Sequence, residues 1–340
     1  ELLFHLPANL IGTGMRFIIY GIGAIGGTLA VCLSRAGYDI IAIARGAQLQ
    51  AIRKTGLRLR TPNGDFTEKF AAVAHPSEID FRPDDMILLT MKSQHTEDAM
   101  RTLRAAGVRE QAIACMQNGV ANERLAARYF ANVLGVVVMM PSTYLEPGEV
   151  TAFGTPKCGL FDVGDFPLGT SAPVDVLCGA LNGSGFAAFP HENVMRGKYG
   201  KLLMNVNNGI DSALGAAARD GIYAQRARAE ALAVYARAGI AHDDVGVDDP
   251  RRQQLMRDGE VKGAPRVGSS AAQSLARGAG SIETDYLNGE IALLGRLHGV
   301  PTPVNACFAA LAAELVAKGL PPGSMSEAEV ETKLARYAAS

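Results

Sequence analysis

The pattern of apolar positions differs between the two halves of this 340-residue chain. In the first half, short runs of consecutive apolar residues alternate with longer stretches at helical spacing, which is typical of buried strands joined by helices. A helix is predicted over 24–36, directly after the first strand. The predicted strands are 16–20, 39–44, 86–91, 113–116 and 133–139. This alternation predicts a parallel sheet with helices on both faces and right-handed crossovers.

Two stretches interrupt the alternation. Residues 56–73 alternate around Thr-Pro-Asn-Gly, which predicts a small hairpin insertion. After Pro141 the chain becomes rich in glycine and proline. Short strands at 151–153 and 158–161 are expected there, and we expect them to extend the sheet.

From residue 174 onward the apolar residues recur at helical spacing, with glycine or proline near the ends of each stretch. Residues 242–266 are charged and contain several glycines, so they are expected to form a long loop or a short exposed helix. The predicted helices are 174–183, 192–218, 223–238, 283–299 and 305–318. The second half is therefore expected to be mainly α-helical.

Composition narrows the class of partner. Charged residues make up 20% of the chain, hydrophobic residues 48%, and the formal net charge is -1. Basic residues are scattered, so we expect no nucleic-acid partner. No uncharged run approaches the roughly 20 apolar residues of a membrane helix, so no membrane association is expected. We therefore expect a small-molecule substrate and a cytoplasmic location.

Cysteines and the first residues add little chemistry. The five cysteines lie far apart without a CxxC pair, and are expected to be reduced core residues. Residues 1–14 lack the basic region and long apolar run of a signal peptide. We interpret them as a flexible extension or a tag remnant, with Met15 as the natural start.

A glycine motif lies between the first predicted strand and the first predicted helix. Gly21, Gly23 and Gly26 form GxGxxG in the setting that makes this motif informative. The first glycine permits a tight turn, the second lets the backbone approach a pyrophosphate, and the third lets the helix pack closely. Amides at the start of the helix, around Ala24 and Ile25, face the phosphate charge. A dinucleotide is therefore the predicted cofactor.

Arg45 follows the second predicted strand, where an NAD enzyme usually has an acid for the ribose 2′-hydroxyl. A guanidinium binds a 2′-phosphate through two parallel hydrogen bonds, whereas an acid would repel it. We therefore predict NADP(H) rather than NAD(H). The expected fold is α/β, with an NADP-binding Rossmann-type parallel-sheet domain at 15–185 and a mainly α-helical substrate and catalytic domain at 186–340.

Several segments from Met15 to about Lys318 together resemble the ketopantoate reductase family, the 2-dehydropantoate 2-reductases. The segments that carry the likeness are the glycine loop with Arg45, Lys92 in Thr90–Thr96, Gln117-Asn118-Gly119, Lys201–Asn205, Ser269-Ser270, Glu283–Gly289 and Gly299–Pro303. The resemblance implies an NADPH-dependent reductase of a small 2-keto acid, with ketopantoate as the first substrate to test and pantothenate biosynthesis as the setting.

The resemblance also implies roles for individual residues. Lys201 becomes the general acid that protonates the carbonyl oxygen while hydride reaches the carbon, a role that an ammonium group suits. Glu283 would accept a hydrogen bond from a bound hydroxyl or steady Lys201. Lys92 and Asn118 follow parallel strands, where ligands of open α/β sheets bind, and suit the cofactor side. The implied substrate-binding residues are Asn118, Asn205, Asn208 and Ser270.

The helix that carries Lys201 departs from the family pattern, because Gly209 stands where the family usually has a second asparagine. At about 100° per residue, Asn205 and Asn208 share the face of Lys201 on a continuous helix. Either Asn208 replaces the missing amide, or the pocket is reshaped for a substrate other than ketopantoate.

Other readings of the function stay open. Ala271 and Ala272 stand where the family tends to carry bulkier residues, which again leaves the substrate open. A reductase of another small ketone or aldehyde, an opine-type dehydrogenase and a non-catalytic NADP(H)-binding redox sensor are the alternatives. No histidine has a carboxylate or cysteine at ligand spacing, so no metal site is expected. A homodimer is left open. The sensor is disfavoured by the joint presence of Lys201, Asn205, Ser270 and Glu283.

Overall fold

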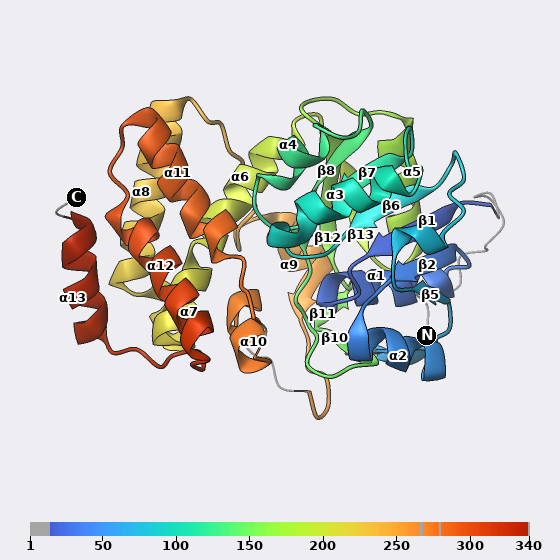
Figure 1. Ribbon diagram of the computed structural model, residues 1–340, viewed down its shortest axis with the longest axis horizontal. Helices are drawn as coiled ribbons and strands as arrows, with labels where there is room; N and C mark the ends of the chain where they lie inside the picture. Colours follow the sequence, from blue (N-terminus) through green and yellow to red (C-terminus); the bar gives the residue numbers. More distant parts are fainter. Residues whose placement is uncertain (1–13, 265–267, 279, 339–340) are drawn as a thin grey trace.

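The structure is a computed structural model that describes residues 14–264, 268–278 and 280–338. Residues 1–13 of the predicted extension lie outside this part. Figure 1 shows a strand-rich body formed by the first half of the chain, beside a body of helices formed by the second half. The predicted combination of a Rossmann-type sheet region and a helical region is confirmed.

An eight-stranded sheet forms the strand-rich body, in the order β13-β12-β8-β7-β6-β1-β2-β5. Its strands are β1 (Arg16–Tyr20), β2 (Asp39–Ile43), β5 (Ala71–Val73), β6 (Met86–Leu89), β7 (Ala112–Cys115), β8 (Val133–Met139), β12 (Leu160–Asp165) and β13 (Ala187–Pro190). Neighbouring strands are parallel except β12, which runs antiparallel to β8. The sheet is therefore mixed, because no crossover helix separates β8 from β12.

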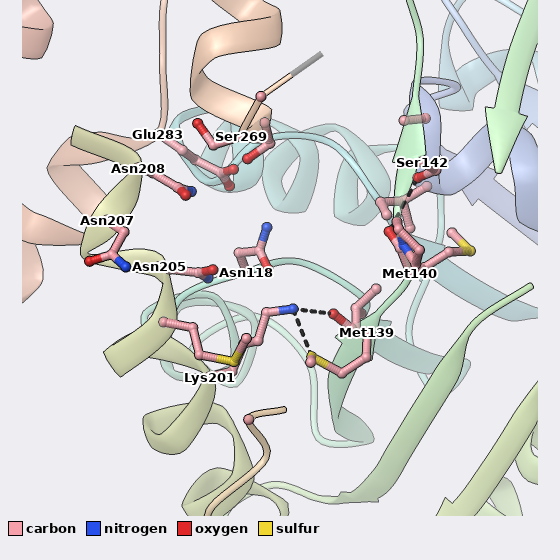
Figure 2. A pocket seen from close by; sticks show the side chains of 18 of the residues that line it. Asn118, Met139, Met140, Ser142, Lys201, Asn205, Asn207, Asn208, Ser269 and Glu283 are labelled. Carbon is pink, nitrogen blue, oxygen red and sulfur yellow. Dashed lines mark hydrogen bonds between the residues drawn. The ribbon is translucent and has the colours of Figure 1, made fainter. Parts of the chain in front are cut away.

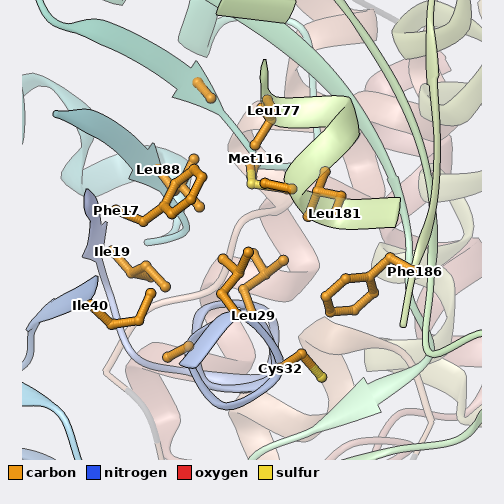
Figure 3. Packing of buried hydrophobic residues seen from close by; sticks show 14 of the residues in the cluster. Phe17, Ile19, Leu29, Cys32, Ile40, Leu88, Met116, Leu177, Leu181 and Phe186 are labelled. Carbon is orange, nitrogen blue, oxygen red and sulfur yellow. The ribbon is translucent and has the colours of Figure 1, made fainter. Parts of the chain in front are cut away.

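Helices cover both faces of this sheet, and alternate residues of β1 are therefore buried on opposite sides. Phe17 packs on one face with Leu29 and Leu177, as Figure 3 shows, whereas Ile18 packs on the other face with Met100. Burial on both faces explains why β1 is a continuous apolar run. The helices of this body are α1 (Ala24–Arg35), α2 (Gly46–Thr55), α3 (Thr96–Ala105), α4 (Asn122–Ala126) and α5 (Ala172–Gly183).

A second sheet of four strands lies against α1. Its strands, in the order β4-β3-β10-β9, are β3 (Leu57–Thr61), β4 (Gly64–Glu68), β9 (Ser142–Thr143) and β10 (Glu149–Ala152). The predicted hairpin is confirmed as β3 and β4. The prediction that residues 151–153 extend the main sheet is wrong, because β10 pairs with β3. Val150 and Leu57 instead pack over Gly27 of α1, where the missing side chain leaves room.

The helical body is built around buried Tyr235 and Phe308. The single helix predicted over 192–218 is wrong, because it is interrupted at Val206, whose carbonyl accepts a 2.8 Å hydrogen bond from the Asn288 side chain. The helix predicted from Glu283 begins after a 3-10 turn instead. The helices are α6 (Val194–Asn205), α7 (Asn207–Leu214), α8 (Ile222–Ala238), α10 (Ser270–Ala276), α11 (Asn288–His298), α12 (Pro303–Lys318) and α13 (Glu327–Ala338).

The segment predicted as a loop or short helix over 242–266 forms both a helix and a strand within its described part. Helix α9 (Pro250–Leu255) leads into β14 (Met256–Asp258), which pairs antiparallel with β11 (Gly154–Pro156). Arg251 binds the buried carboxylate of Asp162 with two nitrogens, at 2.6 and 3.1 Å, which fixes α9 on the main sheet. Short 3-10 turns occupy Pro76–Glu78, Ser93–His95, Ala216–Asp220 and Thr284–Tyr286.

Two further properties of the described residues bear on function. None of their helices combines the length and the apolar character needed to cross a bilayer. All five cysteines are buried and none forms a disulfide, as expected for core residues.

Candidate active site

A cavity of 1490 Å³ lies between the carboxyl ends of the parallel strands and the helical body. Ligand sites usually measure about 300–1,000 Å³, so this cavity has room for a dinucleotide together with a small substrate. Gly21, Gly26 and Arg45 are absent from its lining. The predicted site residues that line it are Gly23, Ala24, Ile25, Lys92, Asn118, Lys201, Asn205, Asn208, Ser270 and Glu283.

The glycine turn between β1 and α1 is shaped to admit a phosphate group. Gly21 has a φ of +104°, and a Cβ on Gly26 would lie 2.2 Å from the Gly21 carbonyl oxygen, so both positions require glycine. A Cβ on Gly23 would meet nothing within 4 Å and would project into the cavity. The turn thus keeps open the space that a pyrophosphate needs beside the first amides of α1. These residues fit a dinucleotide.

Arg45 precedes α2 and stands at the carboxyl end of β2, as predicted from the sequence. Its side chain is 64% exposed and its guanidinium lies 3.8 Å from the exposed carboxylate of Asp98. Such a pair contributes little stability and leaves the guanidinium accessible to a ligand. The first turn of α2 is tied to the glycine turn, because Gln48 donates a 3.1 Å hydrogen bond to the Ile22 carbonyl.

Lys201 of α6 points toward the carboxyl end of β8 (Figure 2). Its Nζ donates to the Val138 carbonyl at 2.7 Å and to the Met139 sulfur at 2.9 Å. Within the described residues no carboxylate forms an ion pair with it. Burial, together with the positive charges of Arg252 and Lys198, lowers the pKa of Lys201 to about 7. This lysine is poised to exchange a proton near neutral pH.

Two asparagine side chains approach the cavity from the junction of α6 and α7. Asn205 is only 7% exposed, and its Nδ2 finds no acceptor in the described part of the chain. In Figure 2 its side chain points toward Asn118, and Asn208 lies above it. A buried amide donor without a partner is costly unless a ligand satisfies it. The junction therefore offers hydrogen bonds to a polar substrate.

The first residues of α7, Asn207 and Asn208, line the cavity, and the next residue does not. Asn208 lines it, whereas a Cβ on Gly209 would lie 2.7 Å from Asn288 Oδ1 and 3.2 Å from Phe308 Cβ. Gly209 thus packs against the helical core and does not itself line the cavity. Ala271 and Ala272 are also buried away from the cavity lining, so neither enlarges it.

Glu283 is anchored to the sheet rather than to Lys201. Its Oε1 accepts hydrogen bonds from the backbone N–H of Ser93 at 2.9 Å and from the Ser93 hydroxyl at 2.8 Å. Burial raises the pKa of the carboxyl group, and these two hydrogen bonds oppose that rise. Asn122 Nδ2 donates to the same Ser93 hydroxyl at 3.0 Å. No hydrogen bond joins Glu283 to Lys201 in the described structure.

Lys92 spans the two bodies. Its Nζ donates to the Ser274 hydroxyl at 2.7 Å and to the Ser281 carbonyl at 2.9 Å. Burial lowers its pKa to about 8, with Glu283 opposing and Arg277 adding to the decrease. Ser270, the predicted substrate ligand, is exposed at the first residue of α10.

A buried ion pair beneath the site escaped the sequence analysis. Lys198 of α6 pairs with Glu123 of α4, and its Nζ also donates to the Gln117 carbonyl at 3.0 Å. Burial raises the pKa of Glu123, while Lys198 lowers it. The pair holds the segment before Asn118 against the helix of Lys201. No motif marks it, because its members are 75 positions apart.

The described side chains do not provide the ligand set of a metal site. Across residues 14–264, 268–278 and 280–338, no three or more histidine, cysteine, aspartate or glutamate residues come together as a metal site.

The two ends of the cavity define the class of protein. One end fits dinucleotide phosphates, and the other holds a lysine able to exchange a proton near neutrality. A dinucleotide-dependent oxidoreductase requires both a site for its cofactor and a group that transfers a proton. Family models agree: residues 17–166 match "Ketopantoate reductase PanE/ApbA" and residues 193–316 match its C-terminal counterpart. The chain belongs to the ketopantoate reductase family, and the predicted resemblance is confirmed.

Curated relatives point to the same family. A 2-dehydropantoate 2-reductase of Pyrococcus horikoshii is 27% identical over 301 residues, which cover 87% of this chain and 96% of the relative. The enzyme of the same name from Mesorhizobium japonicum is 28% identical over 330 residues, covering 88% of this chain and 98% of the relative.

Solved structures share the fold. A PanE/ApbA family ketopantoate reductase from Ralstonia eutropha aligns with a TM-score of 0.75 and 28% identity, covering 90% of this chain and 99% of that one. D-mandelate dehydrogenase with NADH and anilino(oxo)acetate aligns with a TM-score of 0.75 and 23% identity, over 90% of this chain and 99% of that one. The second likeness shows the fold alone.

Proposed function

We propose that this protein reduces a small 2-keto acid with NADPH, and that 2-dehydropantoate, which yields pantoate, is its substrate. The relatives named 2-dehydropantoate 2-reductase support the substrate. The observation that carries the proposal is Lys201, a lysine without a carboxylate partner in the described structure, whose pKa is lowered to about 7 beside two buried asparagines.

Lys201 acts as the general acid. A bound nicotinamide supplies hydride to the keto carbon, which builds negative charge on the carbonyl oxygen. The ammonium group of Lys201 stabilises that charge and donates the proton. The Val138 carbonyl and the Met139 sulfur hold Nζ in place, so little reorganisation is needed.

The remaining polar groups bind and orient the substrate. The free Nδ2 of Asn205, with Asn208, Asn118 and Ser270, donates hydrogen bonds to carboxylate and hydroxyl oxygens of the keto acid. Glu283, fixed by Ser93, accepts a hydrogen bond from a hydroxyl of the substrate or of the cofactor ribose. Each residue thereby limits the poses in which the keto carbon faces the hydride donor.

NADPH is preferred over NADH through Arg45. This guanidinium is exposed at the carboxyl end of β2, where the adenosine ribose of a Rossmann-bound dinucleotide lies, and it can bind a 2′-phosphate bidentately. Lys92 and the glycine turn contribute the remaining cofactor contacts. The cytoplasmic location and the homodimer stay predictions.

A substrate panel tests the proposal. Initial rates are measured by loss of reduced-nicotinamide absorbance with 2-dehydropantoate, pyruvate, 2-oxobutanoate and benzoylformate, each with NADPH and with NADH. The highest kcat/KM is expected for 2-dehydropantoate with NADPH. A higher kcat/KM for benzoylformate would show that 2-dehydropantoate is not the preferred substrate. A preference for NADH would contradict the role proposed for Arg45. Binding of NADPH without turnover of any member would favour the redox sensor.

A further inference from the structure

Helix α10 turns a polar stripe toward the cavity. Ser270, Gln273, Ser274 and Arg277 follow the spacing i, i+3, i+4 and i+7, and all four line the cavity. On a helix packed against another domain, this spacing ordinarily carries apolar residues. Leu275, by contrast, packs into the helical core. The stripe is therefore the surface that α10 presents to the cavity and to the sheet body.

Arg277, at the carboxyl end of this stripe, is a half-buried cation. Its Nη1 donates to the Tyr144 carbonyl, its Nη2 donates to the Ser274 hydroxyl at 3.4 Å, and its guanidinium lies 5.3 Å from the centre of the Tyr144 ring. Burial lowers the pKa of Arg277, and no carboxylate forms an ion pair with it in the described residues. A desolvated guanidinium without a counter-ion is costly, and an anionic ligand would offset that cost.

A second cation shares the same hydroxyl. Lys92 Nζ donates to Ser274 Oγ at 2.7 Å, so one serine side chain accepts hydrogen bonds from both Lys92 and Arg277. The two like charges oppose each other, since Arg277 contributes to the lowered pKa of Lys92. The nearby carboxylate, Glu283, is already engaged by Ser93. The pair of cations thus retains positive charge to offer an anion.

The position of this pair indicates which anion it binds. Lys92 follows Met91, whose backbone N lies 2.7 Å from the place of a Cβ on Gly21, so it adjoins the glycine turn. Tyr144 follows β9, which packs against α1. Gly23 and the first residues of α1 line the same cavity. The cations and the amides at the start of α1 therefore line the same cavity, and both attract a phosphate.

We propose that Arg277, together with Lys92, binds the pyrophosphate of the dinucleotide from the helical body, opposite the glycine turn. This inference rests on the proposed binding of a nicotinamide dinucleotide, but not on the identity of the keto acid. Arg277 and Arg45 then divide cofactor recognition between them. Arg277 contacts a group that NADPH and NADH share, whereas Arg45 contacts the 2′-phosphate that NADPH alone carries.

Binding titrations of two matched variants test the assignment without turnover. The Kd values of NADPH and NADH are measured by reduced-nicotinamide fluorescence, in the absence of keto acid, for wild type, Arg277→Gln and Arg45→Gln. Arg277→Gln is expected to weaken both cofactors about equally, on the order of tenfold or more, because charge-assisted hydrogen bonds are lost. Arg45→Gln is expected to weaken NADPH alone.

Three outcomes would overturn the assignment. If folded Arg277→Gln keeps both wild-type Kd values, Arg277 does not bind the pyrophosphate. Unchanged Kd values with a raised KM for the keto acid would assign Arg277 to the substrate carboxylate instead. A loss confined to NADPH would place it at the 2′-phosphate. Thermal unfolding of each variant shows that it is folded, and Arg277→Lys, which keeps the charge but loses the planar fork, is expected to bind with intermediate affinity. The titrations succeed or fail whatever the substrate panel gives.

Discussion

The chemistry at the residue scale depends on what surrounds one ammonium group. Lysine in water has a pKa near 10.4, too high for ready proton donation at neutral pH. Lys201 lies among a carbonyl oxygen, a sulfur and two cations, so burial and like charge act in the same direction and bring its pKa to about 7. A pKa near the working pH is what general acid catalysis favours.

The rate of keto-acid reduction should therefore depend on pH through Lys201. Below about pH 7 the amine carries its proton and kcat should be highest; as pH rises through the pKa of about 7, the donor is lost and kcat should fall. The reverse oxidation needs the neutral amine and should rise over the same interval. Measuring kcat in both directions from about pH 5 to pH 9 checks this. A reduction rate that stays level up to pH 9 would contradict the role of Lys201.

At the residue scale, the sequence predicted which side chains line the cavity better than it predicted their hydrogen-bond partners. The sequence placed Asn205 and Asn208 beside Lys201, and both line the same cavity, although Asn208 belongs to α7 and not to the helix of Lys201. By contrast, the bond between Ser93 and Glu283 joins positions 190 apart, and no local pattern signals such a contact. Arg277 was missed for the same reason, because its meaning comes from the helix face and from distant Tyr144.

At the scale of elements, Gly23 and Gly26 have different roles in the turn between β1 and α1. Gly23→Ala should fold normally, because its φ is -98° and its Cβ would meet nothing within 4 Å. The added methyl group should nonetheless occupy the phosphate space and weaken NADPH binding by on the order of tenfold or more. Gly26→Ala should destabilise the protein itself, since its Cβ would lie 2.2 Å from the Gly21 carbonyl oxygen.

Thermal unfolding and NADPH titration of these two variants distinguish the role in cofactor binding from the role in folding. A Tm near wild type with a raised Kd is expected for Gly23→Ala, and a clearly lowered Tm for Gly26→Ala. Equal losses of stability in both variants would show that Gly23 is needed for folding rather than for the ligand.

Elements with a strong local pattern were predictable, and those set by distant contacts were not. The buried apolar runs at Arg16–Tyr20 and Val133–Met139 were predicted to the residue. The interruption at Val206 could not be, because the amide that binds the Val206 carbonyl belongs to Asn288, 82 positions away. A strand was predicted at 151–153, close to β10, but only the packing of Val150 on α1 decides that β10 joins the small sheet.

At the scale of the whole molecule, polar contacts join the two bodies across the cavity. Lys92 reaches Ser274, and Gln94 donates to the Ser281 hydroxyl at 2.8 Å. A dinucleotide held between the bodies adds contacts to both of them at once, so it should stabilise the molecule as a unit.

NADPH should accordingly raise the unfolding temperature. At a free concentration of 100 times its Kd, a ligand that binds only the folded state adds about 2.7 kcal/mol. Calorimetry with equal concentrations of NADPH and NADH should show a larger rise in Tm for NADPH, because Arg45 favours the 2′-phosphate. A single transition that shifts with ligand is expected. Equal shifts for the two cofactors would contradict the preference.

The most direct test of the proposed function is the rate of hydride transfer in Lys201→Ala. Stopped-flow absorbance follows NADPH oxidation by 2-dehydropantoate in wild type and variant, and fluorescence titration gives the Kd of NADPH for both. If Lys201 is the general acid, the rate should fall by a factor on the order of 10² or more, while the Kd stays nearly unchanged. A wild-type rate in the folded variant would contradict it.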